Sequence, residues 1–97
     1  MRLLLVEDDQ RAARYLVRSL TESGHVVDHV ADGESGLALA LEAIYDVLVV
    51  DRRLPGLDGV SLVRALRQSD PHTPVLMLSA IASAPDRIAE IEAGCDD

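Results

Sequence analysis

The sequence has no lysine, no phenylalanine and no tryptophan, and it has a single cysteine among 97 residues. Aromatic residues make up only 2% of the chain, so aliphatic side chains must fill the core of any folded domain. The lone Cys95 cannot form an internal disulfide, which is typical of a reducing compartment. We expect it to be a small packing residue.

Long apolar runs and clustered positive charges are also absent. No run approaches the ~20 apolar residues that a membrane-spanning helix needs. Met1-Arg2-Leu3 leads directly into an apolar stretch that is too short and too soon acidic for a signal peptide. The net charge of −8 argues against nucleic acid binding by this domain, because phosphate contacts need clustered cations. We therefore expect a cytoplasmic domain that contacts neither membrane nor nucleic acid.

The chain is long enough for one small domain, residues 1–97, with 48% hydrophobic content. Four strands are predicted, at residues 2–6, 25–30, 46–50 and 75–78. Each is followed by a segment whose apolar residues recur at helical spacing, and Asp9 and Asp58 are suited to cap two of these helices. The alternation of strands and helices predicts an α/β fold, with a parallel sheet covered on both faces.

The last predicted helix is bounded by Pro85, which is favoured at a first helical position, and by Gly94, which can end a helix. Ile88 and Ile91 are its predicted core-facing residues. Three acids in the same segment are expected to form a solvated face: Asp86, Glu90 and Glu92.

Three of the apolar runs end in oxygen-bearing residues. Glu7 and Asp8 follow the first run, Asp51 follows 46–50, and Ser79 follows 75–78. Ligands bind beyond the carboxyl ends of strands in such sheets, so these groups should gather at one edge. Three carboxylates without a cation repel one another and raise a pKa, and Mg²⁺ relieves this repulsion. Glu7, Asp8 or Asp51 alone would be interpreted as a solvated strand end or a helix cap, and we interpret Asp9 as a helix cap. The joint placement of Glu7, Asp8 and Asp51 after two apolar strands predicts a magnesium site.

A carboxylate beside Mg²⁺ can accept a phosphoryl group and form an aspartyl-phosphate. Asp51 is the best candidate, because it ends the most apolar strand just before a loop. The Ser79 hydroxyl and the Ala80 backbone N–H can donate to the phosphoryl oxygens. A lone serine after a strand is ordinarily a turn residue, and only the neighbouring acids favour this role.

The longer motifs resemble the receiver domain of two-component response regulators, particularly the OmpR/PhoB subfamily. They are LLVEDD (4–9), DRRLPGLDG (51–59), TPVLMLSA (73–80) and AGCDD (93–97). The resemblance implies a CheY-like (flavodoxin-like) doubly wound parallel sheet. It also implies that the chain is truncated after the fourth helix, so that the family's fifth strand and fifth helix are missing.

The resemblance further implies roles for individual residues. Asp51 would be the phosphoacceptor, Glu7 and Asp8 the acidic pair, and Ser79 the switch hydroxyl. The backbone carbonyl of Arg53 would join Asp8 and Asp51 around Mg²⁺. A sensor histidine kinase would donate the phosphoryl group, and phosphorylation would favour a homodimer. The output would be DNA binding by an effector domain beyond these residues. Such a domain is no metabolic enzyme: it catalyses only slow phosphoryl transfer to itself and slow autodephosphorylation.

Two departures from the family pattern have consequences. The first departure is that two arginines, Arg52 and Arg53, follow Asp51. The Arg53 side chain could pair with Glu7 or fold across the phosphoryl site, or both arginines could be solvated. The sequence leaves these alternatives open. Without the family's lysine, which helps to neutralise the phosphoryl charge, we expect weak or absent phosphorylation. With no fifth strand, residues 75–78 would form an open apolar edge, which predicts edge-strand association or domain swapping.

Two other functions are weighed against this one. A Mg²⁺-dependent phosphohydrolase would need a second aspartate two residues after the nucleophile, and Arg53 occupies that position. A phosphorylation-independent, receiver-like interaction module is the remaining alternative.

Overall fold

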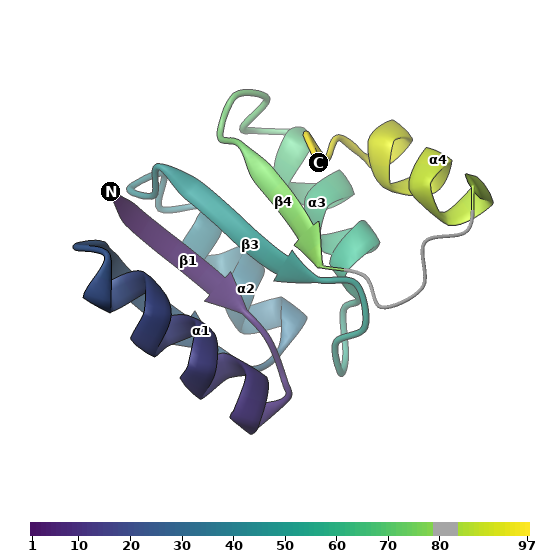
Figure 1. Ribbon diagram of the computed structural model, residues 1–97. Helices are drawn as coiled ribbons and strands as arrows, with labels where there is room; N and C mark the ends of the chain where they lie inside the picture. Colours follow the sequence, from purple (N-terminus) through teal and green to yellow (C-terminus); the bar gives the residue numbers. More distant parts are fainter. Residues whose placement is uncertain (79–83) are drawn as a thin grey trace.

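The computed structural model describes residues 1–78 and 84–97, in which four parallel strands alternate with four helices (Figure 1). The elements are β1 (Arg2–Val6), α1 (Gln10–Glu22), β2 (Val26–Val30), α2 (Gly33–Ala40), β3 (Val47–Asp51), α3 (Gly59–Arg67), β4 (Val75–Leu78) and α4 (Ala84–Ala93). The four predicted strands are confirmed to within one residue at each end. No helix within these described ranges is both long and apolar enough to cross a membrane.

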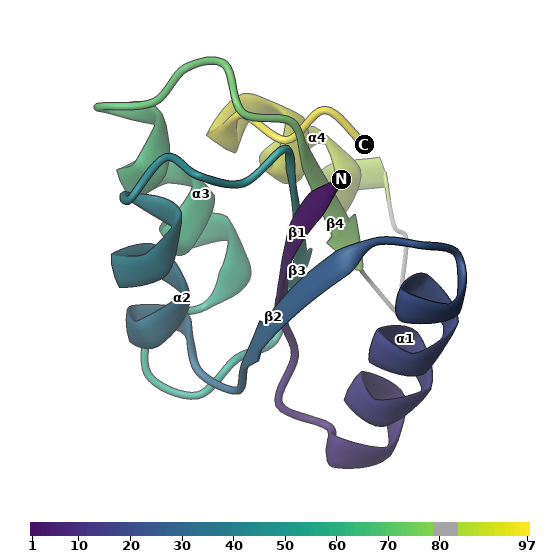
Figure 2. The same ribbon diagram turned by 90° about the vertical axis from the view of Figure 1, so that its left-hand side faces the viewer.

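The strand order is β2-β1-β3-β4, and all neighbouring pairs are parallel. In register, Val6 pairs with Val50 and Asp51 pairs with Leu78, so the carboxyl ends of β1, β3 and β4 lie at one edge. Viewed along the sheet, α1 covers one face, and α2 and α3 cover the other (Figure 2). The predicted doubly wound arrangement is confirmed.

The main core lies between the sheet and α2 and α3. Alternate residues of the central strands point into it, and the i, i+1, i+4 residues of α3 meet them. Its fully buried members are Leu4, Val6, Leu48, Val50, Leu62, Val63, Leu66 and Val75. Each buried aliphatic side chain stabilises the fold by about 1.5–3 kcal/mol relative to exposure. This aliphatic layer supports the strand ends that carry the acids.

The predicted helix caps are confirmed. Asp9 Oδ1 accepts hydrogen bonds from the backbone N–H groups of Arg11 and Ala12 at the start of α1. Asp58 Oδ1 accepts one from Ser61 N at the start of α3. These side chains satisfy N–H groups that have no partner inside the helix, so each helix has a defined first residue.

The predicted inner face of α4 is wrong. Ile88 and Ile91 are 54% and 67% exposed, whereas Glu90 is 8% and Ala93 4% exposed. Glu90 is buried because it has an arginine partner on the β3–α3 loop. The prediction used only the helical spacing of the apolar residues, which placed the isoleucine side of α4 in the core. It did not consider that a charged residue with an ion-pair partner can occupy the buried side instead.

The predicted open edge of β4 is also wrong over Val75 and Met77, because the last residues of the chain pair with it. Asp96 N and Asp97 N donate to Val75 O at 3.0 and 3.3 Å, and Met77 N donates to Asp97 O at 2.7 Å. Val75 N donates to Asp96 Oδ2 at 2.8 Å. Edge-strand association or domain swapping of this chain stays a prediction, but it cannot use these backbone groups while the tail is docked.

Replacing Asp96 by alanine should lower the free energy of unfolding by about 1–3 kcal/mol. The substitution removes the acceptor of the Val75 N–H and the partner of Arg67, whose guanidinium lies 3.2 Å from Asp96 Oδ2. Chemical denaturation measures this change. Asp97→Ala is the matched control, since Asp97 bonds β4 through its main chain. Equal effects of the two substitutions would contradict the prediction.

Candidate functional site

The acids predicted to gather do gather. Glu7 and Asp8 directly follow β1, and Asp51 is the last residue of the neighbouring β3. One carboxylate oxygen from each of the three lies within 4.8 Å of those of the other two. We call this group, Glu7, Asp8 and Asp51, the acidic cup. Its three-carboxylate donor set suits a hard divalent cation such as Mg²⁺.

The three acids differ in exposure, and the pKa of the buried one, Glu7, is raised. Glu7 is buried, Asp51 is half-buried and Asp8 is exposed. Burial, a hydrogen bond with Asp51, and the negative charges of Asp51 and Asp8 raise the pKa of Glu7 to about 7, against a smaller lowering by a backbone hydrogen bond from Asp9. Below about pH 7, Glu7 therefore carries a proton. A bound cation would remove the need for that proton.

Hydrogen bonds to β2 fix the main chain of Glu7. Its N–H donates to Val30 O at 3.1 Å, and its carbonyl accepts from His29 Nε2 at 2.8 Å. No pattern in the sequence singles out His29. Only the β1–β2 pairing, in which Leu5 lies opposite His29, brings this ring beside the strand end.

The loop after Asp51 folds back tightly on it. Arg52 N donates to Leu78 O and Gly59 N donates to Arg52 O, both at 2.9 Å. A Cβ at Gly59 would lie 2.2 Å from the carbonyl oxygen of Asp51, so only glycine lets α3 start this close. The N–H of Arg53 lies 3.4 Å from Asp51 Oδ1. The loop thus surrounds Asp51 with main-chain groups.

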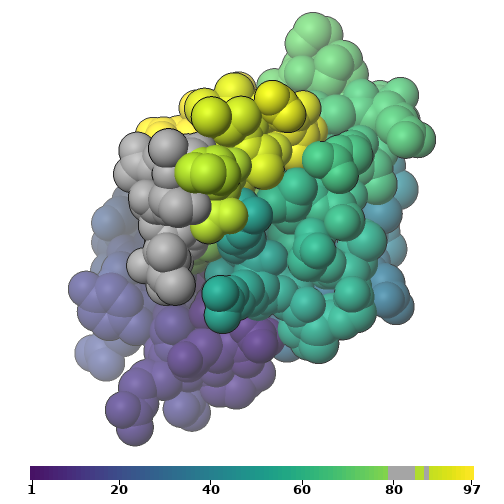
Figure 3. Space-filling model, turned by 90° about the vertical axis from the view of Figure 1, so that its right-hand side faces the viewer, coloured from purple at the N-terminus to yellow at the C-terminus, as the bar shows by residue number. Residues whose placement is uncertain are grey.

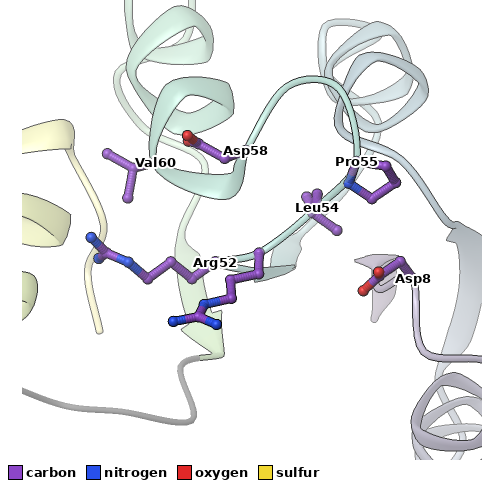
Figure 4. Close-up of a pocket in the computed structure, with 7 residues that line it drawn as sticks. Asp8, Arg52, Leu54, Pro55, Asp58 and Val60 are labelled. Atoms are coloured by element: carbon purple, nitrogen blue, oxygen red, sulfur yellow. The ribbon is translucent and has the colours of Figure 1, made fainter.

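A cavity of about 490 Å³ opens beside the acidic cup. Its lining residues are Asp8, Arg52, Arg53, Leu54, Pro55, Asp58 and Val60. Asp8 and Arg52 lie on opposite sides of it (Figure 4). The space is large enough for a small phosphorylated group to approach the cup from solvent.

The structure separates the two arginines that the sequence could not distinguish. Arg53 is exposed and, among the described residues, forms no ion pair, so the alternative of an Arg53–Glu7 pair is not realised. Arg53 lines the cavity, as Asp8 does. Arg52 is not solvated: it pairs with Asp86 and Glu90 of α4. The expected solvated face of acids is therefore wrong for Glu90, which is buried, whereas Glu92 is exposed.

Ser79 and Ala80 lie outside the described residues, and their roles stay predictions. Leu78, the residue before them, pairs in register with Asp51. The end of β4 therefore lies beside the end of β3.

The fold and the acidic cup together define a class: a doubly wound α/β domain with a cluster of carboxylates at its strand ends. The sequence matches the family described as the response regulator receiver domain over residues 3–97. The chain belongs to this family and has its CheY-like fold.

The curated relatives are OmpR/PhoB-type transcriptional regulators. The chain is 45% identical to the transcriptional regulatory protein TcrA of Mycobacterium tuberculosis over 97 residues, which is 100% of this chain and 38% of TcrA. It is 39% identical to the transcriptional regulatory protein CusR of Escherichia coli, again over 100% of this chain and 43% of CusR. The chain thus spans about two fifths of the length of these relatives.

Solved structures show the same fold. The receiver domain of the Francisella response regulator 1452 superimposes with a TM-score of 0.93 at 35% identity, covering 99% of this chain and 79% of that one. The chemotaxis protein CheY4 of Vibrio cholerae superimposes with a TM-score of 0.91 at 29% identity, covering 97% of this chain and 80% of that one.

In the absence of divalent metal, the free energy of unfolding should fall as pH rises from about 4.5 to about 7, the ordinary and folded-state pKa values of Glu7. In that window the folded state binds a proton that the unfolded state has lost, so raising the pH disfavours folding. We expect a loss of about 1–3 kcal/mol over this range. Urea denaturation in EDTA at several pH values measures it. Glu7→Gln should flatten this dependence of the free energy of unfolding on pH. An unchanged slope in that variant would show that other groups cause the dependence.

Asp51→Asn should raise the melting temperature in EDTA at pH 7.5. The substitution removes one of three crowded anions, and a gain of about 1 kcal/mol corresponds to roughly 4–8 °C for a domain of this size. Differential scanning calorimetry measures the shift. Glu92→Gln, which removes the same charge from an exposed position of α4, is the control and should give a shift near zero. An unchanged or lowered melting temperature in Asp51→Asn would show that the acids are not in conflict.

Proposed function

We propose that this domain is the phosphorylation-controlled switch of a two-component system, and that Asp51 accepts a phosphoryl group from a sensor histidine kinase. The observation that carries the proposal is the acidic cup, whose three carboxylates lie within 4.8 Å of one another beside an open cavity. Among them, Asp51 lies at the end of a central strand, and its Oδ1 accepts a hydrogen bond from the Arg53 N–H in the following loop. Membership of the receiver family supports the same assignment.

Mg²⁺ fits this donor set. Asp8, Asp51 and the backbone carbonyl of Arg53 would hold the ion, and Glu7 would balance its charge. When bound, the ion neutralises charge on the phosphoryl group. The chain itself orients Asp51 through the Arg53 N–H and excludes solvent from Glu7. We assign the Ser79 hydroxyl and the Ala80 N–H to the phosphoryl oxygens.

The proposed output is control of transcription. Both relatives described above are named as transcriptional regulatory proteins, and the chain covers only their receiver-sized part. We propose that phosphorylation of residues 1–97 promotes a homodimer in the cytoplasm and thereby controls DNA binding by a separate effector domain. Ile88 and Ile91 supply an exposed apolar surface on α4 suited to such a contact. The receiver itself contacts no DNA and does no metabolic chemistry beyond slow self-catalysed phosphoryl transfer.

The test is a thermal shift with Mg²⁺ and beryllofluoride, an analogue of the phosphoryl group. Mg²⁺ alone should raise the melting temperature, and beryllofluoride should add a further rise of several degrees, because each binds the folded state only. Asp51→Asn should remove the rise in melting temperature caused by beryllofluoride. Asp8→Asn should raise, at least tenfold, the Mg²⁺ concentration needed for half of the Mg²⁺-induced shift. Glu92→Gln should respond like the wild type.

A different pattern would favour the phosphorylation-independent interaction module. In that case Mg²⁺ would still bind to the cup, but beryllofluoride would cause no further shift at any concentration. A protein that responds to neither reagent would contradict the metal site as well.

A further inference from the structure

Helix α4 is attached to the rest of the domain by charge and by small residues. Its two isoleucines point outward, and its buried described positions include Glu90 and Ala93. A helix usually docks by an apolar stripe, which α1 and α3 provide here and α4 does not. The strength of its attachment therefore depends on what neutralises Glu90.

Arg52 provides that neutralisation. Its NH1 donates to Glu90 Oε2 at 2.7 Å and to the backbone carbonyl of Asp86 at 3.2 Å, and its NH2 lies 3.3 Å from Asp86 Oδ1. The side chains of Arg52 and Glu90 are only 25% and 11% exposed, so water screens this pair weakly. Charge-assisted bonds of this kind are strong, and removing one partner leaves a buried charge without compensation.

The main chain of Arg52 is held just as firmly at the phosphoacceptor. Its N–H bonds Leu78 at the end of β4, and its carbonyl accepts from Gly59 at the start of α3. Arg52 also directly follows Asp51 in the chain. A displacement of Asp51 must therefore move the backbone from which the arginine reaches α4.

A second arginine attaches the other end of α4, and none of its hydrogen bonds or ion pairs within residues 1–78 and 84–97 reaches the acidic cup. Arg67 of α3 donates from Nε to Gly94 O at 2.9 Å and pairs with Asp96. The space-filling view shows α4, in yellow-green, lying on the teal surface of the β3–α3 region and α3 (Figure 3). Of these two arginine anchors, only Arg52 adjoins the proposed phosphoacceptor.

We propose that Arg52 is a positioning residue that transmits the state of Asp51 to α4 through its ion pair with Glu90. The pair sets where α4 lies, and with it the exposed face of Ile88 and Ile91. Occupation of the acidic cup shifts the backbone at Arg52, and the buried ion pair carries this shift to the helix. The inference rests on the proposed function, since it takes Asp51 as the group that is modified.

The experiment is hydrogen–deuterium exchange of α4 amides in the full chain, with Mg²⁺ present and with or without saturating beryllofluoride. In the wild type, beryllofluoride should change the exchange rate of amides 88–93 at least threefold. In Arg52→Met this change should shrink to less than 1.5-fold, although the analogue still binds. Arg67→Met is the matched control: it should speed exchange in α4 both with and without beryllofluoride, and keep the ratio of the two rates.

Fluorine-19 NMR of bound beryllofluoride tests binding at Asp51 separately from the role of Arg52. No bound signal in the wild type would contradict the proposed function. A bound signal with no change in α4, or with an equal change in Arg52→Met, would overturn the role of Arg52. If Arg52→Met does not fold, Glu90→Gln tests the same pair from the helix side and should reduce the response at least twofold. Arg52→Lys, which keeps the positive charge, should recover part of the change in α4 exchange caused by beryllofluoride. A change no larger than that in Arg52→Met would count against the ion pair.

Discussion

Electrostatic repulsion among three carboxylates is the constraint on which this structure depends. Parallel pairing of β1 with β3 forces Glu7, Asp8 and Asp51 to one edge of the sheet, with an oxygen of each within 4.8 Å of the others. The aliphatic core beneath them holds the strands in this register, so the acids cannot move apart without disrupting it. The conflict is relieved locally, by a proton on Glu7 or by a cation in the cup.

The same electrostatic logic governs the attachment of α4. Elsewhere the helices bury aliphatic side chains, whereas α4 buries a glutamate and is held by Arg52. The arginine belongs to the loop that directly follows Asp51, so the acidic cup and the attachment of α4 share one segment of chain. Elements held by few apolar contacts are those most readily displaced, which suits the proposed response of α4 to the state of Asp51.

Chemically similar residues have different fates here, and their sequence positions do not distinguish them. Glu7 and Asp9 lie two residues apart; one is buried with a pKa of about 7, while the other caps α1 in solvent. Arg52 and Arg53 are adjacent, yet one pairs with α4 and the other lines the cavity. In each case the outcome depends on which neighbour the fold brings close. The motifs therefore identified the acids that belong to the cup but not which of them is buried.

The sequence by itself determined the four strands, their parallel order, the helix caps and the set of acids at the sheet edge. These features follow from periodicity, capping chemistry and the rule that strand ends of a parallel sheet converge, all of which are local or topological. Only the tertiary structure decided that Glu90 faces inward, that Asp96 and Asp97 cover the edge of β4, and that His29 supports Glu7. The physical reason is that burial of a polar group depends on a partner distant in the sequence, and no local pattern encodes that partner.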